Sequence, residues 1–148
     1  MLFRSTLSLR MQQHVENAKQ LTRWLLEQGL VTWVNHPDLP DNPTHRVAER
    51  LFPKGAGSIL CFGVKGGRDG GGAFMDALVL SSNLANVGDS RTLVLHPAST
   101  THSRLSDEEM KATGTSPDLI RVSVGIENIA DIIKDFKGGL KAVERLLK

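Results

Sequence analysis

The sequence predicts an α/β sandwich in which helices cover a sheet of about four strands. Four short apolar segments have the length and character of strands, and longer segments with apolar residues at helical spacing lie before, between and after them. The 148 residues, 40% hydrophobic and 23% charged, suit a single domain with one core over residues 1–148. The strands are expected at residues 30–34, 58–64, 92–97 and 119–124.

The first helix is expected over residues 5–28, ending at Gly29. The opening residues 1–15 contain no acid and are basic, as in transit peptides. However, one apolar face continues through them, so we expect a folded helix and not a leader. This face is formed by Leu7, Met11, Val15, Ala18, Leu21 and Leu25.

Two further segments precede the third strand. Residues 44–52 are expected to form a helix capped by Thr44, with Val47 and Leu51 facing inward. The glycine-rich segment 65–72 fits neither the Walker pattern nor GxGxxG, so we interpret it as a flexible turn rather than a phosphate loop. A helix over residues 73–82 is expected to follow it.

The second half of the chain carries two more helix signals. Ser106 and Glu109 have the spacing of a capping box for a short helix that ends near Gly114. A long terminal helix is expected from Asn128, and the pair Gly138-Gly139 is expected to weaken its middle.

Composition excludes several classes of function. The net charge of +2, without a basic stripe, argues against nucleic-acid binding, and no apolar stretch approaches the roughly 18 residues of a membrane span. The lone Cys61 excludes a disulfide framework and is expected to be a buried thiol, which fits a reducing cytoplasm. His96 and His102 are six residues apart and lack nearby acids, so no metal site is expected.

Arg121 is the most informative polar residue. Strand alternation places Leu119, Arg121 and Ser123 on one face, opposite Ile120 and Val122. An arginine in an apolar strand needs an anion, and its planar fork suits a carboxylate. The alternatives are an internal ion pair, for example with Glu127, or a strand face open to water.

Two weaker candidates lie on either side of the third expected strand. The amide of Asn86 stands before the Gly88-Asp89 turn, where it either contacts a ligand or forms the turn. Thr101 offers a hydroxyl after the proline-bent end of the third strand, with the same two alternatives.

Several stretches resemble one enzyme family from Thr6 onward. They are "TLSLRMQQHVENA", "WVNHPDLP", "LFPKGAGSILCFGVKGGRDGG", "ANVGDSRTLVLHPASTTHSRLSDEE" and "TSPDLIRVSVGIENIADII". This pattern resembles the C-terminal domain of the O-acetylhomoserine sulfhydrylases. These belong to the Cys/Met-metabolism group of pyridoxal-phosphate enzymes, together with cystathionine γ-synthase and methionine γ-lyase.

The resemblance implies a fold and a set of roles. The fold would be the small C-terminal domain of the aspartate-aminotransferase type. Arg121 would bind the α-carboxylate of the amino-acid substrate, Asn86 would also contact it, and Thr101 would support the arginine. The activity would convert O-acetylhomoserine and sulfide to homocysteine and acetate.

The same resemblance implies what this chain lacks. In the family a large N-terminal domain holds pyridoxal phosphate through a lysine, and no lysine here has that context; the chain also has no tyrosine. We therefore expect no catalytic or cofactor-binding residue in this chain, and no pyridoxal phosphate bound to it alone. Its partner would be a large-domain polypeptide or further copies of itself. The alternatives are a non-catalytic domain that binds an amino acid or docks on a family member, or part of a sibling enzyme.

Overall fold

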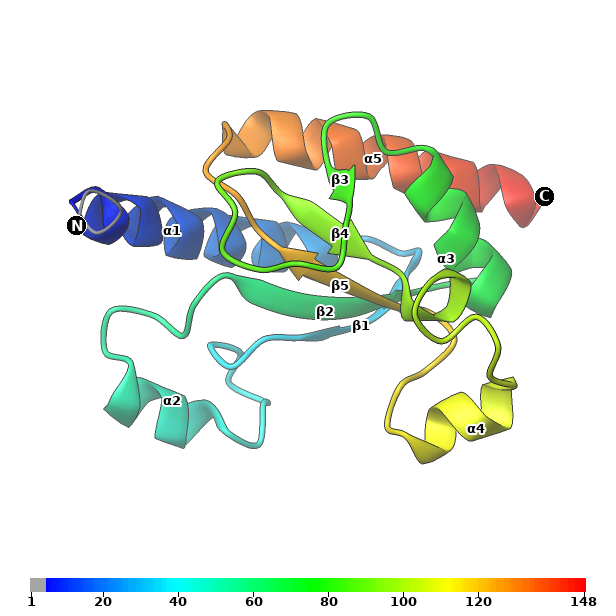
Figure 1. Cartoon of the computed structure of the whole chain (residues 1–148), viewed down its shortest axis with the longest axis horizontal. Coiled ribbons are helices and arrows are strands. Elements are labelled where there is room, and N and C mark those ends of the chain that lie inside the picture. The colour runs from blue at the N-terminus through cyan, green and yellow to red at the C-terminus, as the bar shows by residue number, and fades with distance from the viewer. Residues whose placement is uncertain (1–4) are drawn as a thin grey trace.

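The computed structural model describes residues 5–148 and contains a five-stranded sheet (Figure 1). The strand order is β1-β2-β5-β4-β3, and all neighbours are antiparallel except the parallel pair β3 and β4. The four expected strands are present, and the two-residue β3 is additional. The strands are β1 (Val31–Asn35), β2 (Ile59–Val64), β3 (Ser82–Asn83), β4 (Leu93–Leu95) and β5 (Leu119–Ser123).

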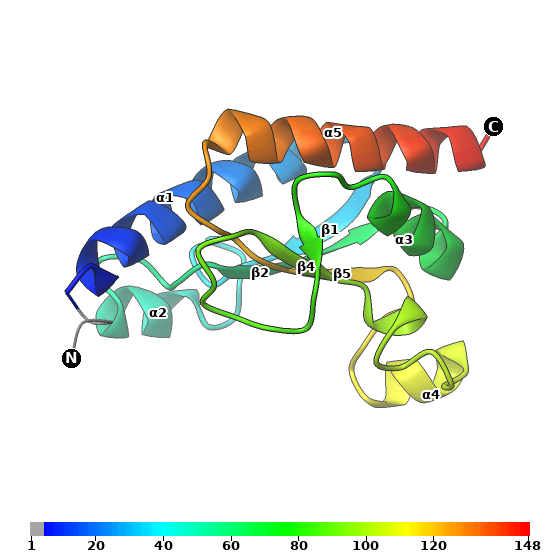
Figure 2. The same cartoon turned by 45° about the horizontal axis from the view of Figure 1, so that its top comes forward.

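Three long helices cover one face of the sheet, which confirms the predicted α/β class. They are α1 (Leu7–Leu26), α3 (Gly67–Asp76) and α5 (Ile129–Leu146). Figures 1 and 2 show two short helices on the opposite side, one toward each end of the sheet. These are α2 (His45–Leu51) and α4 (Asp107–Ala112); the 3-10 turn η2 (Pro97–Ser99) follows β4.

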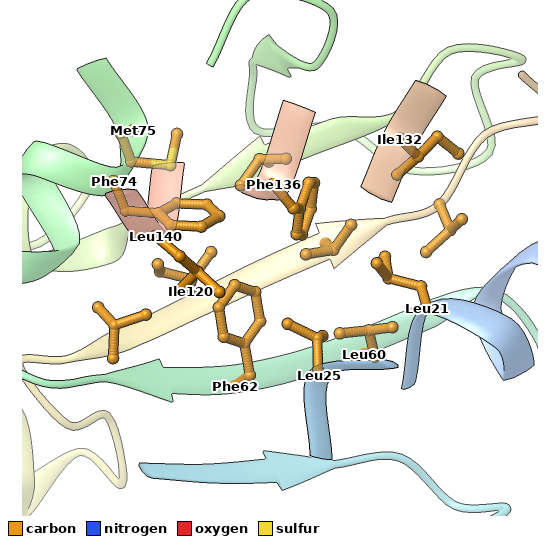
Figure 3. Close-up of a cluster of buried hydrophobic side chains, with 14 of the residues drawn as sticks. Leu21, Leu25, Leu60, Phe62, Phe74, Met75, Ile120, Ile132, Phe136 and Leu140 are labelled. Carbon is orange, nitrogen blue, oxygen red and sulfur yellow. The ribbon is translucent and has the colours of Figure 1, made fainter. Parts of the chain in front are cut away.

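Three phenylalanines lie at the centre of the core between the sheet and the helices (Figure 3). Phe62 comes from β2, Phe74 from α3 and Phe136 from α5, and all three are fully buried. Their ring centroids are 5.4–6.0 Å apart, and Phe74 meets both other rings edge to face. This cluster joins three elements that are far apart in the sequence.

Only the second half of α1 packs as predicted. Ala18, Leu21 and Leu25 are fully buried against the sheet and α5, whereas Leu7 and Met11 are 43% and 38% exposed. Figure 1 shows the first turns of α1, in dark blue, extending past the strands. The apolar face therefore continues beyond the layer that it covers.

The glycine-rich segment is not the flexible turn that we expected. Gly66 and Gly67 have left-handed φ angles of 91° and 59° and reverse the chain after β2, and α3 then begins at Gly67. A Cβ on Gly70 would lie 2.0 Å from the Lys65 carbonyl oxygen, and one on Gly71 would lie 2.2 Å from Nε2 of His96. These glycines are helical and allow α3 to approach its neighbours closely.

Helix α3 ends at Asp76, earlier than the expected residue 82. The carboxylate of Asp135 on α5 accepts hydrogen bonds from the backbone N–H groups of Val79, Leu80 and Ser81 at 2.7–3.1 Å. These three N–H groups therefore bond to Asp135 instead of to the carbonyl groups of a longer α3. The bonds lower the pKa of Asp135, although its burial acts in the opposite direction.

The prediction for α2 was wrong in two respects. Thr44 makes no capping bond; its hydroxyl donates to Oδ1 of Asn42 at 2.7 Å. Val47 and Leu51 are 47% and 58% exposed, and only Ala48 of this helix is buried. The physical reason is that α2 lies off the sheet, with no second layer to cover its apolar side chains.

The other two helices agree better with expectation. Ser106 and Glu109 form both hydrogen bonds of the predicted capping box on α4. Asn128 caps α5 through the N–H of Ala130. The pair Gly138-Gly139, where we expected a weak point, does not interrupt α5. A side chain at Gly139 would collide with the Phe74 ring, so the glycine allows α5 to pack closely against α3.

Adjacent glycines of α3 provide a matched test of this packing. Gly71→Ala should lower the free energy of unfolding by about 1–3 kcal/mol, because its methyl group would overlap the His96 ring. Gly72→Ala should raise it by roughly 0.5–1 kcal/mol, because nothing lies within 4 Å of its Cβ and alanine favours helix. Chemical denaturation of both variants checks this; equal effects would contradict the close approach of α3 to His96.

Candidate functional site

The alternation predicted for β5 is confirmed. Ile120 and Val122 are fully buried in the core beneath the helices, and Arg121 is partly exposed on the opposite face. In register with Arg121 stand Cys61 on β2 and Leu95 on β4. Arg121 therefore lies on the middle strand of the sheet, and its side chain is on the face that the three long helices do not cover.

The expected ion pair between Arg121 and Glu127 is not formed. The carboxylate of Glu127 instead accepts hydrogen bonds from the backbone N–H of Thr92 at 2.6 Å and from its hydroxyl at 2.9 Å. Across residues 5–148, no carboxylate lies within 4.0 Å of the Arg121 guanidinium. Its charge is thus not neutralised by an acid of the described chain.

The structure brings Asn86 next to Arg121, but through the backbone. Nη2 of Arg121 donates a long hydrogen bond of 3.4 Å to the carbonyl oxygen of Asn86. The side-chain Oδ1 of Asn86 accepts from the backbone N–H of Val87, as a turn-forming asparagine does. Gly88 donates to the hydroxyl of Ser123 at 3.3 Å, which holds this loop over β5.

Thr101 lies in the turns that follow η2 and is exposed. Its hydroxyl shares a hydrogen bond of 2.8 Å with Nδ1 of its neighbour His102. Within the described chain, Thr101 forms no hydrogen bond with Arg121 or Asn86. The role of Thr101 at the site therefore stays a prediction.

His96 was considered only as a metal ligand in the sequence, and its structural role was missed. The ring is fully buried; Nε2 donates to the carbonyl of Pro117 at 2.9 Å, and Nδ1 lies 2.9 Å from the hydroxyl of Ser99. In the described part of the chain, no group of three or more His, Cys, Asp or Glu side chains is arranged to hold a metal ion. His96 thus anchors the start of the segment that contains Thr101.

Cys61 is half-buried rather than buried as expected, because it shares the open face with Arg121. Burial raises the pKa of its thiol, and the charge of Arg121 opposes this. The alternation of side chains in β2 indicates this position of Cys61 in the sequence. Leu60, Phe62 and Val64 face the core, so Cys61 faces away from it.

The site as a whole can bind a carboxylate. An arginine with no acidic partner stands on an open sheet face, beside a backbone carbonyl that orients one of its nitrogens. Its remaining N–H donors can form two parallel hydrogen bonds with a carboxylate group.

No helix formed by residues 5–148 is both long enough and apolar enough to span a membrane.

Comparison with known proteins defines the class. Residues 4–141 match the family model described as Cys/Met metabolism PLP-dependent enzyme, so the chain belongs to that family of pyridoxal-phosphate enzymes. It is 51% identical over 135 residues to O-acetyl-L-homoserine sulfhydrylase 1 of Thermus thermophilus and 49% identical over 136 residues to homocysteine synthase of Schizosaccharomyces pombe. The matches cover 91% and 92% of this chain but 32% of each relative, so the chain spans about a third of their length.

Solved structures show the same relationship. The fold matches an O-acetylhomoserine sulfhydrylase of Wolinella succinogenes with a TM-score of 0.78 and 36% identity, over 91% of this chain and 35% of that one. It matches cystathionine γ-synthase of Xanthomonas oryzae with a TM-score of 0.85 and 35% identity, over 95% of this chain and 36% of that one. The predicted relationship to this enzyme family is confirmed.

The described residues do not by themselves fit pyridoxal phosphate. The cofactor needs a lysine amine and a cradle for its ring and phosphate. Lys19 is partly exposed and lies 3.8 Å from the carboxylate of Asp38, and every other lysine is exposed. None is buried beside Arg121, and the chain has no tyrosine.

We predict that His96 makes the free energy of unfolding depend on pH. Burial is the main cause that lowers its pKa below the usual 6.5, so the folded protein keeps the ring neutral where the unfolded chain binds a proton. This stabilisation is complete above about pH 6.5 and should be lost as pH falls through the lower folded pKa. Denaturation at several pH values between 7.5 and 5 should show a shallower decline for His96→Gln. An identical slope for both proteins would contradict it.

Proposed function

We propose that this chain supplies the substrate-carboxylate-binding part of a pyridoxal-phosphate-dependent O-acetylhomoserine sulfhydrylase. Such an enzyme makes homocysteine and acetate from O-acetylhomoserine and sulfide, in the synthesis of methionine and cysteine. The observation that carries the proposal is Arg121, a guanidinium on an open sheet face with no acid of the described chain beside it. The sulfhydrylase relatives that match over most of the chain support it.

Arg121 would act by binding and orienting. O-acetylhomoserine carries an α-carboxylate, and a bidentate pair with the guanidinium would fix both its position and its rotation. In the intact enzyme, pyridoxal phosphate supplies the electron sink for chemistry at the substrate carbons. In this proposal the chain holds the carboxylate through Arg121, which donates to the Asn86 carbonyl, and Thr101 would support the arginine.

A partner would complete such an enzyme. We propose that it is a large-domain polypeptide or further copies of the chain, with residues 1–148 acting as one domain. The projecting end of α1 supports this, because Leu7 and Met11, which share one face of the helix, are 43% and 38% exposed. The proposal also places the protein in the cytoplasm, where the single free thiol of Cys61 stays reduced.

One observation favours a second candidate, a non-catalytic domain that binds an amino acid. It is the lack, among the described residues, of a lysine placed to hold the cofactor. Both candidates use Arg121 for the carboxylate, and they differ in whether turnover follows when a large domain is present.

A chimera separates the two candidates. This chain would replace the matching 135-residue region of the Thermus thermophilus relative. The chimera should convert O-acetylhomoserine and sulfide to homocysteine. Arg121→Lys should raise KM for O-acetylhomoserine about tenfold or more, because an ammonium keeps the charge but cannot form the two parallel bonds. The absorbance of bound cofactor should not change.

The matched control is Arg104→Lys, which alters an exposed arginine outside the strands and should leave KM within about twofold. An inactive chimera with full cofactor loading would favour the non-catalytic domain. An active chimera in which Arg121→Lys leaves KM unchanged would contradict the role of Arg121.

A further inference from the structure

Arg68 lies at the start of α3, next to the segment that follows β4. The left-handed Gly66 and Gly67 turn the chain immediately before it, so the first turn of α3 begins close to η2. The Arg68 side chain is 31% exposed. Most of the side chain is therefore covered, although its hydrogen bonds to Asp107 lie at the surface.

The guanidinium of Arg68 binds both ends of residues 98–107. Nη1 donates to the carbonyl of Ala98, and Nη2 donates to the carbonyl of Leu105 at 2.9 Å. Nη2 and Nε also donate to Oδ1 of Asp107, at 2.9 and 3.2 Å. One side chain thus joins the beginning and the end of this ten-residue segment.

Between these ends, the hydrogen bonds of the segment are all short-range, including that from the Thr100 hydroxyl to the His96 carbonyl. Thr100 and His102 donate to the carbonyl of Pro97 at 3.1 and 2.8 Å, and Leu105 donates to that of His102 at 3.0 Å. No strand pairs with these residues. The shape of the segment, and with it the place of Thr101, therefore depends on the side chains that anchor its ends.

We propose that Arg68 is a positioning residue for the substrate site. By joining Ala98 to Leu105 and Asp107, it sets the position of Thr101 relative to Arg121. The inference rests on the proposed function, in which Thr101 supports the arginine that binds the carboxylate. Lysine cannot replace Arg68, because one ammonium group lacks the fork that reaches carbonyls at both ends.

Hydrogen exchange of this chain tests the anchoring directly. In Arg68→Gln and in the milder Arg68→Lys, the amides of residues 98–107 should exchange about tenfold faster or more, while those of β2, β5 and α5 keep their rates. Arg104→Lys, an exposed arginine within the same segment, should change none of them. Unchanged exchange over residues 98–107 in Arg68→Lys would overturn the inference.

The chimera with the Thermus thermophilus relative tests the substrate role. Arg68→Lys should raise KM for O-acetylhomoserine to the same extent as Thr101→Val, with kcat within about twofold and cofactor absorbance unchanged. The KM of the double variant should be no higher than that of the more impaired single variant, because both changes act on one contact. Additive effects, or loss of kcat and cofactor together, would show general loosening and overturn it.

The two possible failures are distinguishable. An inactive unsubstituted chimera would overturn the proposed function and, with it, the substrate role of Arg68. An active chimera whose KM does not respond to Arg68→Lys would overturn the inference about Arg68 alone.

Discussion

The hydrogen bonding of β5 between β2 and β4 is the constraint on which both the core and the candidate site depend. Ile120 and Val122 are buried completely, and burying such a side chain contributes about 1.5–3 kcal/mol. A slip of one residue would exchange these side chains for Arg121 and put an unpaired charge into the core. The packing energy of one face thus keeps the guanidinium on the other.

The two faces of the sheet differ in role, because one forms the hydrophobic core and the other carries the candidate site. The helix-covered face is closed by Phe62, Phe74 and Phe136 and gives rigidity (Figure 3). The other face carries Arg121 and is bordered by segments from distant parts of the chain. The loop at Asn86 is tied to β5, and residues 98–107 are tied to α3 through Arg68. In the proposed function, this arrangement would bind and orient a carboxylate, while the chemistry would come from a cofactor that the described residues do not fit.

Local sequence patterns predicted much of this structure. The strands at 58–64 and 119–124, the capping box at Ser106 and the placement of Arg121 all follow from periodicity or short-range spacing. What could not be predicted depends on tertiary contacts. The helical glycines of α3 follow from the approach of His96, and the exposure of Val47 follows from the place of α2 off the sheet. The Arg68 hydrogen bonds span 30 to 42 residues and have no local signature.

The most direct test of the account is a crystal structure of the chimera with a bound amino-acid substrate or product. The account predicts that the α-carboxylate forms two hydrogen bonds with the Arg121 guanidinium, at about 2.7–2.9 Å, on the open face of β5. A carboxylate bound elsewhere, with Arg121 paired to an acidic side chain of the protein, would contradict it.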